Sequence, residues 1–361
     1  MTVLLSELSN TDIDWMVGVG ERQTVTAGTA LVAPGTTPNA VYLLLNGSFS
    51  LAIPPAAHGH GAMSTMNDPC GEQEITRLIQ GEIVGETPLF NIRPIAVVRA
   101  IEESMVLSIP QHQLATKLRH DVSFSAHFYR AIALILSERL RQILEKPGQL
   151  NLATNQPVKE ALFVFGELWD SDIDWLVAVG YLQKFAAGQT LIQAGRPVDA
   201  LHIILDGLVS VNKHEMDDNN LLTLCFECMD AKAQSQTVVA RVSKGEMGGM
   251  SSFLDFRPLP VTLQAVNEAL VLTIPRSQLV SKLQQDMGFA SRFYRILAIQ
   301  LTDILQTVMS QMGCSHQSYS EDRGMDDDME YDDELNMESL QNISHGAARF
   351  NWMLKRLGVG S

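Results

Sequence analysis

The chain contains the same pattern twice, about 160 residues apart, and this repeat limits the fold more than any other feature. SELSNTDIDW at residues 6–15 returns as GELWDSDIDW at 166–175. Farther along, the offset grows to 164 and then to 165: FNIRP at 90–94 matches LDFRP at 254–258, and both copies then contain FYR. A slowly drifting offset is typical of a duplicated unit with short loop insertions. The 361 residues therefore predict two copies of one domain and a C-terminal extension.

Each unit is predicted to be an antiparallel roll between helices. A helix carrying a tryptophan comes first, and short strands separated by glycines follow. Gly47 and Gly207 stand where a hairpin needs a tight turn. Apolar residues at helical spacing predict a long helix at the end of each unit, over 124–145 and 289–312. The fold class is therefore α+β: two tandem antiparallel β-roll (jelly-roll-like) domains, each flanked by helices. In the first unit, strands are expected at 29–32, 40–45 and 48–53.

Linker composition sets the expected domain boundaries. A Lys-Pro-Gly stop ends the first long helix, and the acidic run at 321–338 holds ten acidic residues and one arginine. That run carries −9 of the net charge of −15, so we expect it to be disordered. The expected organisation is a first domain at 1–148, a linker at 149–163, a second domain at 164–312, an acidic disordered linker at 313–338 and an amphipathic helix at 339–358.

Composition also excludes several classes of partner and location. Both the acidic run and the rest of the chain are negatively charged, which argues against binding nucleic acid through its phosphates. No apolar run is long enough to span a bilayer, and the N-terminus lacks the pattern of a secretory signal. Four cysteines without a signal favour the reducing cytoplasm. The expectation is a cytoplasmic protein.

The order of helix, roll and long helix resembles the cyclic-nucleotide-binding domain family, to which the sensor domain of catabolite activator protein belongs. The resemblance covers most of residues 4–147 and 164–312 and is strongest at the phosphate-binding cassette. The cassette reads GEIVGETPLFNIRPIAVVRA at 81–100 and GEMGGMSSFLDFRPLPVTLQA at 245–265. The Arg-Pro-x-x-Val form and the Phe-Tyr-Arg helix are similar to a variant found in cyanobacterial members.

In this family, N–H groups at the start of a short helix hold the cyclic phosphate, a glutamate binds the ribose hydroxyl, and an arginine neutralises the phosphate. The first unit keeps Gly85 and Glu86, but the position of the arginine falls on Pro94 or Ile95. A buried phosphate without its partner loses about 2–5 kcal/mol, or roughly two to three decades of affinity.

The second unit departs further from the family pattern. It keeps Gly249, but Met250 replaces the glutamate, and the position of the arginine falls on Leu259 or Pro260. Both pockets are therefore expected to be largely degenerate. No cofactor is certain, and cAMP or cGMP are the candidate ligands.

Arg93 and Arg257 stand at matching places shortly before the missing arginines. They have two interpretations: they swing into the pockets, or they cap the short cassette helices or pair at the surface. The candidate nucleotide-binding residues are Gly85, Glu86, Arg93, Gly249 and Arg257.

The C-terminal extension predicts one amphipathic helix with Ser339 as its N-cap and Gly358 as its stop. It has three interpretations: packing on its own domains, docking on a partner protein, or lying on a membrane surface, which its few basic residues make unlikely. The candidate docking residues form one stripe: Leu340, Ile343, Phe350, Leu354 and Leu357.

Other motifs give little chemistry. A single CxxC at Cys225 and Cys228 lacks the second pair of a zinc site, and His58 with His60 lies in a Gly/Pro-rich insertion, so no metal site is expected. No helix-turn-helix follows either long helix, and no catalytic constellation is visible.

Three functions remain open. The first is a non-enzymatic regulator or adaptor that acts through protein–protein interaction, with the two long helices paired as an intramolecular pseudo-dimer and with further homo-oligomers left open. The pseudo-dimer is expected to have an apolar seam with Ile132, Leu136, Leu301 and Leu305. The second is a genuine cAMP or cGMP sensor acting through the first unit. The third is a structural or scaffolding component of a larger assembly.

Overall fold

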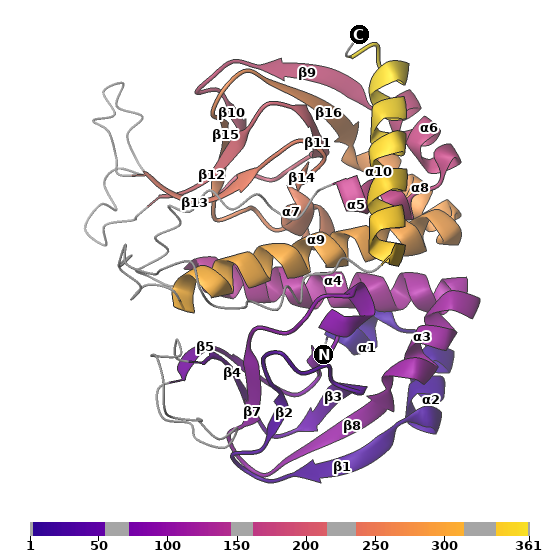
Figure 1. Ribbon diagram of the computed structural model, residues 1–361, viewed down its shortest axis with the longest axis vertical. Coiled ribbons are helices and arrows are strands. Elements are labelled where there is room, and N and C mark those ends of the chain that lie inside the picture. The colour runs from indigo at the N-terminus through magenta and orange to yellow at the C-terminus, as the bar shows by residue number, and fades with distance from the viewer. Residues whose placement is uncertain (1–2, 55–71, 146–161, 215–235, 314–336, 360–361) are drawn as a thin grey trace, which may run out of the picture.

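The computed structural model describes residues 3–54, 72–145, 162–214, 236–313 and 337–359. It shows two similar units with a pair of long helices between them (Figure 1). Each unit is a roll of two four-stranded antiparallel sheets, flanked by helices. The expected α+β fold with two tandem β-rolls is confirmed.

The first unit begins with two short helices and ends with two more, and its strands lie between them. Ser9 caps the second helix through the amide of Asp12, whose carboxylate accepts the Ser9 amide at 2.9 Å in return. The elements are α1 Val3–Glu7, α2 Asn10–Val19, β1 Glu21–Val25, β2 Ala30–Val32, β3 Ala40–Asn46, β4 Phe49–Ile53, β5 Gln73–Leu78, β6 Ile83–Val84, the 3-10 helix η1 Thr87–Phe90, β7 Val97–Ala100, β8 Ser104–Pro110, α3 Gln111–His120 and α4 Val122–Glu145.

The second unit repeats this order, and a last helix follows it. An α-helix, α7, replaces the 3-10 turn of the first cassette. The elements are α5 Leu162–Glu167, α6 Asp170–Val179, β9 Tyr181–Phe185, β10 Thr190–Ile192, β11 Ala200–Asp206, β12 Val209–His214, β13 Gln236–Val242, β14 Met247–Gly248, α7 Met250–Asp255, β15 Thr262–Ala265, β16 Ala269–Pro275, α8 Arg276–Gln285, α9 Met287–Gly313 and α10 Met337–Arg356.

The sheets of the two units have the same strand order. In the first unit the orders are β1-β8-β3-β6 and β2-β7-β4-β5, and in the second they are β9-β16-β11-β14 and β10-β15-β12-β13. Gly47 and Gly207 both have φ of +88°, so the two β-hairpins turn through the left-handed backbone that glycine permits. The duplication in the sequence is therefore a duplication of topology.

Helices α4 and α9 lie side by side across the middle of the molecule and join the two units (Figure 1). Apolar residues line the seam because both helices carry a stripe at helical spacing. At the start of the helices, the hydroxyls of Ser125 and Ser291 are 2.7 Å apart. The four residues expected at the seam, Ile132, Leu136, Leu301 and Leu305, are at most 4% exposed.

Several expectations differ from the structure in detail. The last helix begins at Met337, so Ser339 lies inside it and is not its N-cap. Gly358 does follow its end, with φ of +68°. His58, His60, Cys225 and Cys228 lie outside the described residues, as does the acidic run up to residue 336. None of the helices that the structure describes is long and apolar enough to cross a bilayer.

Candidate functional site

The first cassette closes tightly against β3. Gly85 has φ of +83°, and a Cβ placed on it would lie 2.8 Å from the carbonyl oxygen of Ala40, so only glycine fits this approach. The turn brings Glu86 to the start of η1, where its side chain is buried. The family glutamate is therefore in the expected place, at the inner end of the roll.

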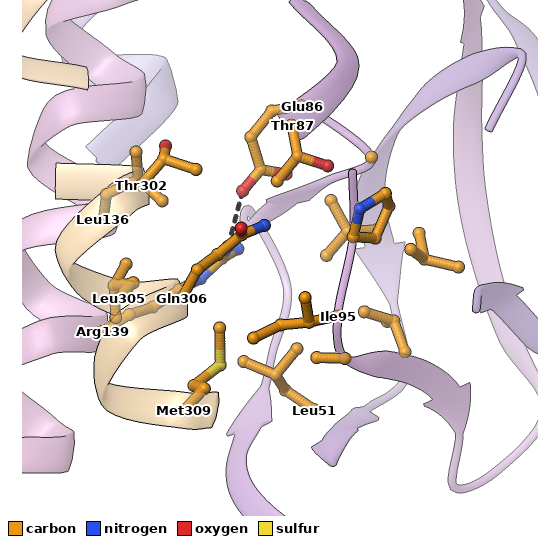
Figure 2. Close-up of a pocket in the computed structure, with 16 residues that line it drawn as sticks. Leu51, Glu86, Thr87, Ile95, Leu136, Arg139, Thr302, Leu305, Gln306 and Met309 are labelled. Atoms are coloured by element: carbon orange, nitrogen blue, oxygen red, sulfur yellow. Dashed lines mark hydrogen bonds and ion pairs between the residues drawn. The ribbon is translucent and has the colours of Figure 1, made fainter. Parts of the chain in front are cut away.

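An arginine from the long helix occupies the space in front of this glutamate. Nη1 of Arg139 in α4 donates to Oε1 of Glu86 at 3.0 Å, and both side chains are 7% exposed (Figure 2). The same guanidinium also donates to the carbonyl oxygen of Ile83, and its Nε donates to Glu82 at 3.3 Å. Three groups thus satisfy Arg139 at one time, and each comes from the cassette or the turn before it. Glu86 is the acceptor in a structural ion pair.

A cavity of about 60 Å³ lies beside this pair. Its walls come from both units, because α9 of the second unit closes one side (Figure 2). The first unit supplies mainly apolar side chains, and α9 supplies Thr302, Leu305, Gln306 and Met309. Any ligand in this cavity would contact both halves of the chain.

The position of the family arginine is apolar. Pro94 and Ile95 both line the cavity. Arg93 is exposed and is not among the lining residues, while its carbonyl oxygen accepts a hydrogen bond from Nε2 of Gln306 at 2.8 Å. The guanidinium that does line the cavity is that of Arg139.

The second cassette has the same backbone but different chemistry. Gly249 has φ of +89° and caps α7, and Met250 is buried where the first unit has Glu86. With the offset of 165 that applies to the long helices, Arg139 corresponds to Ile304. The buried ion pair of one unit is thus replaced by two apolar residues in the other. Glu246, the counterpart of Glu82, has no arginine beside it, and burial raises its pKa.

Arg257 pairs between the units. Its Nε donates to the Asp255 carboxylate at 2.9 Å, its Nη2 contacts Glu138 of α4, and the side chain is half exposed. A more buried arginine joins the same acid: Arg141 of α4 donates to Asp255 at 2.9 Å and to the carbonyl oxygen of Pro258 at 2.7 Å. The structure therefore places Arg257 in a network that fastens α4 to the second cassette.

Arg139 and Arg141 are the residues that motif matching missed. Both lie in the long helix, far from the cassettes in sequence. The available signal is that two arginines occur on a helix whose neighbouring positions are apolar on nearly every side, which indicates buried partners.

The C-terminal helix packs on its own chain. Phe350 and Met353 are fully buried, and the ring centroid of Phe350 is 5.0 Å from that of Phe165 in α5. Arg349 donates to the carbonyl oxygen of Gly166 at 2.7 Å, and Arg356 pairs with Asp174 of α6 at 3.0 Å. Leu354 is also buried and Leu357 is half-buried, while the side chains of Leu340 and Ile343 lie outside the described residues. From Arg349 on, the expectation that this helix docks on a partner is corrected to packing in cis, because its apolar face is already covered.

Comparison with known proteins agrees with this architecture. The model of the family described as cyclic nucleotide-binding domain matches residues 22–121 and 182–286. Lysophospholipase nte1 of Aspergillus oryzae is 25% identical over 133 residues, 37% of this chain. A second nte1, from Aspergillus terreus, is 25% identical over 130 residues, 36% of this chain. The chain spans about 8% of the length of these curated relatives.

Solved structures with similar folds include regulatory proteins. The regulatory domain of Toxoplasma gondii PKA with cAMP is 13% identical, with a TM-score of 0.28, 81% of this chain covered and 90% of that one. The regulatory subunit of a cAMP-independent protein kinase A from Trypanosoma cruzi, bound to guanosine, is 18% identical, with a TM-score of 0.27 and coverage of 80% and 85%. The N-terminal domain of a Streptomyces coelicolor transcriptional regulator is 23% identical, with a TM-score of 0.32 and coverage of 40% and 89%.

The assignment itself rests on the family model, whose two matched segments cover more than half of the chain, one in each roll. The chain therefore belongs to the cyclic nucleotide-binding domain family, with the domain present twice.

Proposed function

We propose that this chain is a non-enzymatic, cytoplasmic regulator or adaptor that acts through protein–protein contact and whose two cassettes do not bind a cyclic nucleotide. The observation that carries the proposal is the ion pair between Glu86 and Arg139. It uses the cassette glutamate as a structural group, and it fills the space in front of that glutamate with a side chain of the same protein.

The electrostatics of the first unit support this proposal. A cyclic phosphate brings a negative charge, and Pro94 and Ile95 offer no counter-charge at the family arginine position. Arg139 is already neutralised by Glu86 and also donates to Glu82 and Ile83, so its recruitment by a phosphate would leave buried carboxylates unpaired.

The second unit is a poorer candidate still. Met250 supplies no acceptor for a ribose hydroxyl, and Arg257 is engaged by Asp255 and Glu138. Regulation by this chain would then depend on what contacts its surface.

Calorimetric titration of cAMP and of cGMP into the full chain tests the proposal. We expect no saturable heat and no shift in melting temperature up to millimolar ligand. Micromolar binding at one site per chain, lost in Glu86→Ala, would contradict it.

That contrary result would favour the second candidate, a cyclic-nucleotide sensor acting through the first unit. One observation favours that candidate: Gly85, Glu86 and a guanidinium, that of Arg139, all line the same cavity. A third candidate, a scaffold, would be recognised by a stoichiometric high-mass complex when the chain is isolated from its own cell.

A further inference from the structure

The cavity of the first unit keeps free volume that the ion pair does not fill. At about 10–15 Å³ for one water molecule, its 60 Å³ holds roughly five non-hydrogen atoms. This is far below the size of a nucleotide. Most of the wall is hydrocarbon, including Val32, Leu51, Val98, Leu136 and Leu305. The surface that remains for a ligand is therefore small and apolar.

One polar atom in this wall lacks a partner. The hydroxyl oxygen of Thr87 is buried and has no hydrogen-bond partner among the described residues. Its neighbours are satisfied: the Thr302 hydroxyl donates to the carbonyl oxygen of Ala298 at 2.8 Å, and the Gln306 amide donates to that of Arg93. A buried hydroxyl without a partner is costly, so the cavity has one unmet hydrogen bond at Thr87.

A charged ligand does not fit this surface. Glu86 and Arg139 neutralise each other, and a further buried charge would have no partner among the residues that line the cavity. We propose that the cavity is a binding site for a small uncharged amphiphile, with an apolar body of a few carbons and one hydroxyl that bonds to Thr87.

Such a ligand would also act on the arrangement of the two units. Leu305 and Met309 of α9 belong to the second unit, and they form part of the wall. A molecule that fills the cavity contacts α9 and the first roll at once, so it stabilises the packing of one on the other. This inference rests on the proposed function, because it assigns the cavity to a ligand other than a nucleotide.

The probe is 1-butanol, titrated into the full chain and followed by the methyl NMR signals of Met309 and of residues around the cavity. We expect saturable shifts in the millimolar range, as is reasonable for a ligand with this number of atoms. Thr87→Val keeps the shape but removes the hydroxyl, and it should weaken butanol binding by about five-fold, the value of one hydrogen bond. Xenon, which needs no hydrogen bond, should bind both forms equally.

Cavity-filling variants distinguish binding from a general solvent effect. Ala96→Leu should abolish the saturable shifts, and Val98→Ile, a smaller change that serves if the first variant does not fold, should weaken them. Butanol responses that are the same in wild type and in the filled variants would overturn the proposal. Equal butanol affinity in Thr87→Val would overturn the role of the hydroxyl. The nucleotide titration is a separate measurement, so failure of this inference leaves the proposed function standing.

Discussion

Glu86 and Arg139 form a buried ion pair in the first unit, and the matching positions of the second unit carry Met250 and Ile304. The chain thus contains both solutions to one packing problem. Replacing a buried pair by apolar residues of similar size is often neutral, whereas removing one partner leaves a buried charge.

The two solutions can be exchanged by mutation. Glu86→Met alone should lower the free energy of unfolding by about 3–5 kcal/mol, because Arg139 loses its buried partner. The double variant Glu86→Met/Arg139→Ile should recover most of that loss, and Glu82 would then resemble Glu246, whose pKa is raised by burial. Urea unfolding measures both, with the exposed Glu74→Met as a control for a surface pair. A double variant no more stable than the single one would refute the equivalence.

The network that fastens α4 to the second cassette gives a matched pair of variants. Arg141→Met should cost about 2–3 kcal/mol, because a buried donor to Asp255 and Pro258 is lost, though Asp255 keeps Arg257. Arg257→Met should cost less than about 1 kcal/mol, because its contacts are half exposed. Chemical denaturation of the full chain compares them, and equal losses would contradict this ranking.

Stability should depend on pH through His202 in β11. Burial lowers the pKa of His202 to about 4 from the usual 6.5, so the unfolded chain binds a proton at this residue that the folded chain refuses. Its contribution is complete above about pH 6.5 and is lost as the pH falls toward 4, in total about 3 kcal/mol.

The matched control is His202→Tyr, because the first unit has Tyr42 at this position. Unfolding measured between pH 4 and 7 should be less sensitive to acid in the variant, and the comparison cancels the other titrating groups. An unchanged pH dependence would show that His202 is protonated in the folded protein.

The C-terminal helix should detach when its central contact is removed. Phe350→Ala removes a fully buried ring that packs on Phe165, a change that typically costs about 3–5 kcal/mol. Hydrogen exchange should then show loss of protection in α10 with little change in α4. Asn351→Ala, on an exposed position of the same helix, should leave the protection unchanged. Detachment in both variants would mean that helix propensity, not the Phe350 contact, holds α10.

The sequence predicted the two rolls and the long helices because a duplicated pattern reports on itself. Gly47 with Gly207, and the seam residues on α4 and α9, were found because turn geometry and helical spacing leave a periodic record. The remaining differences at the ends of elements are one or two residues, apart from Ser339, where the last helix begins two residues earlier than its cap signal indicates.

The contents of the pocket left no such record. Arg139 is more than 50 residues from Glu86 in sequence, and only the three-dimensional packing of α4 against the cassette brings them together. The tail helix is a similar case. Its amphipathic stripe shows that one face needs a cover, and periodicity alone does not say whether α5 or another protein supplies it.

Placing both rolls in one polypeptide has a consequence for how such a protein evolves. When two identical chains associate, each substitution appears on both sides of the axis, so a residue that suits one side must suit the other. Here α4 and α9 are encoded separately. A guanidinium was free to settle in one cassette while its twin became a hydrocarbon, and the two halves can divide between them tasks that a symmetric pair must share.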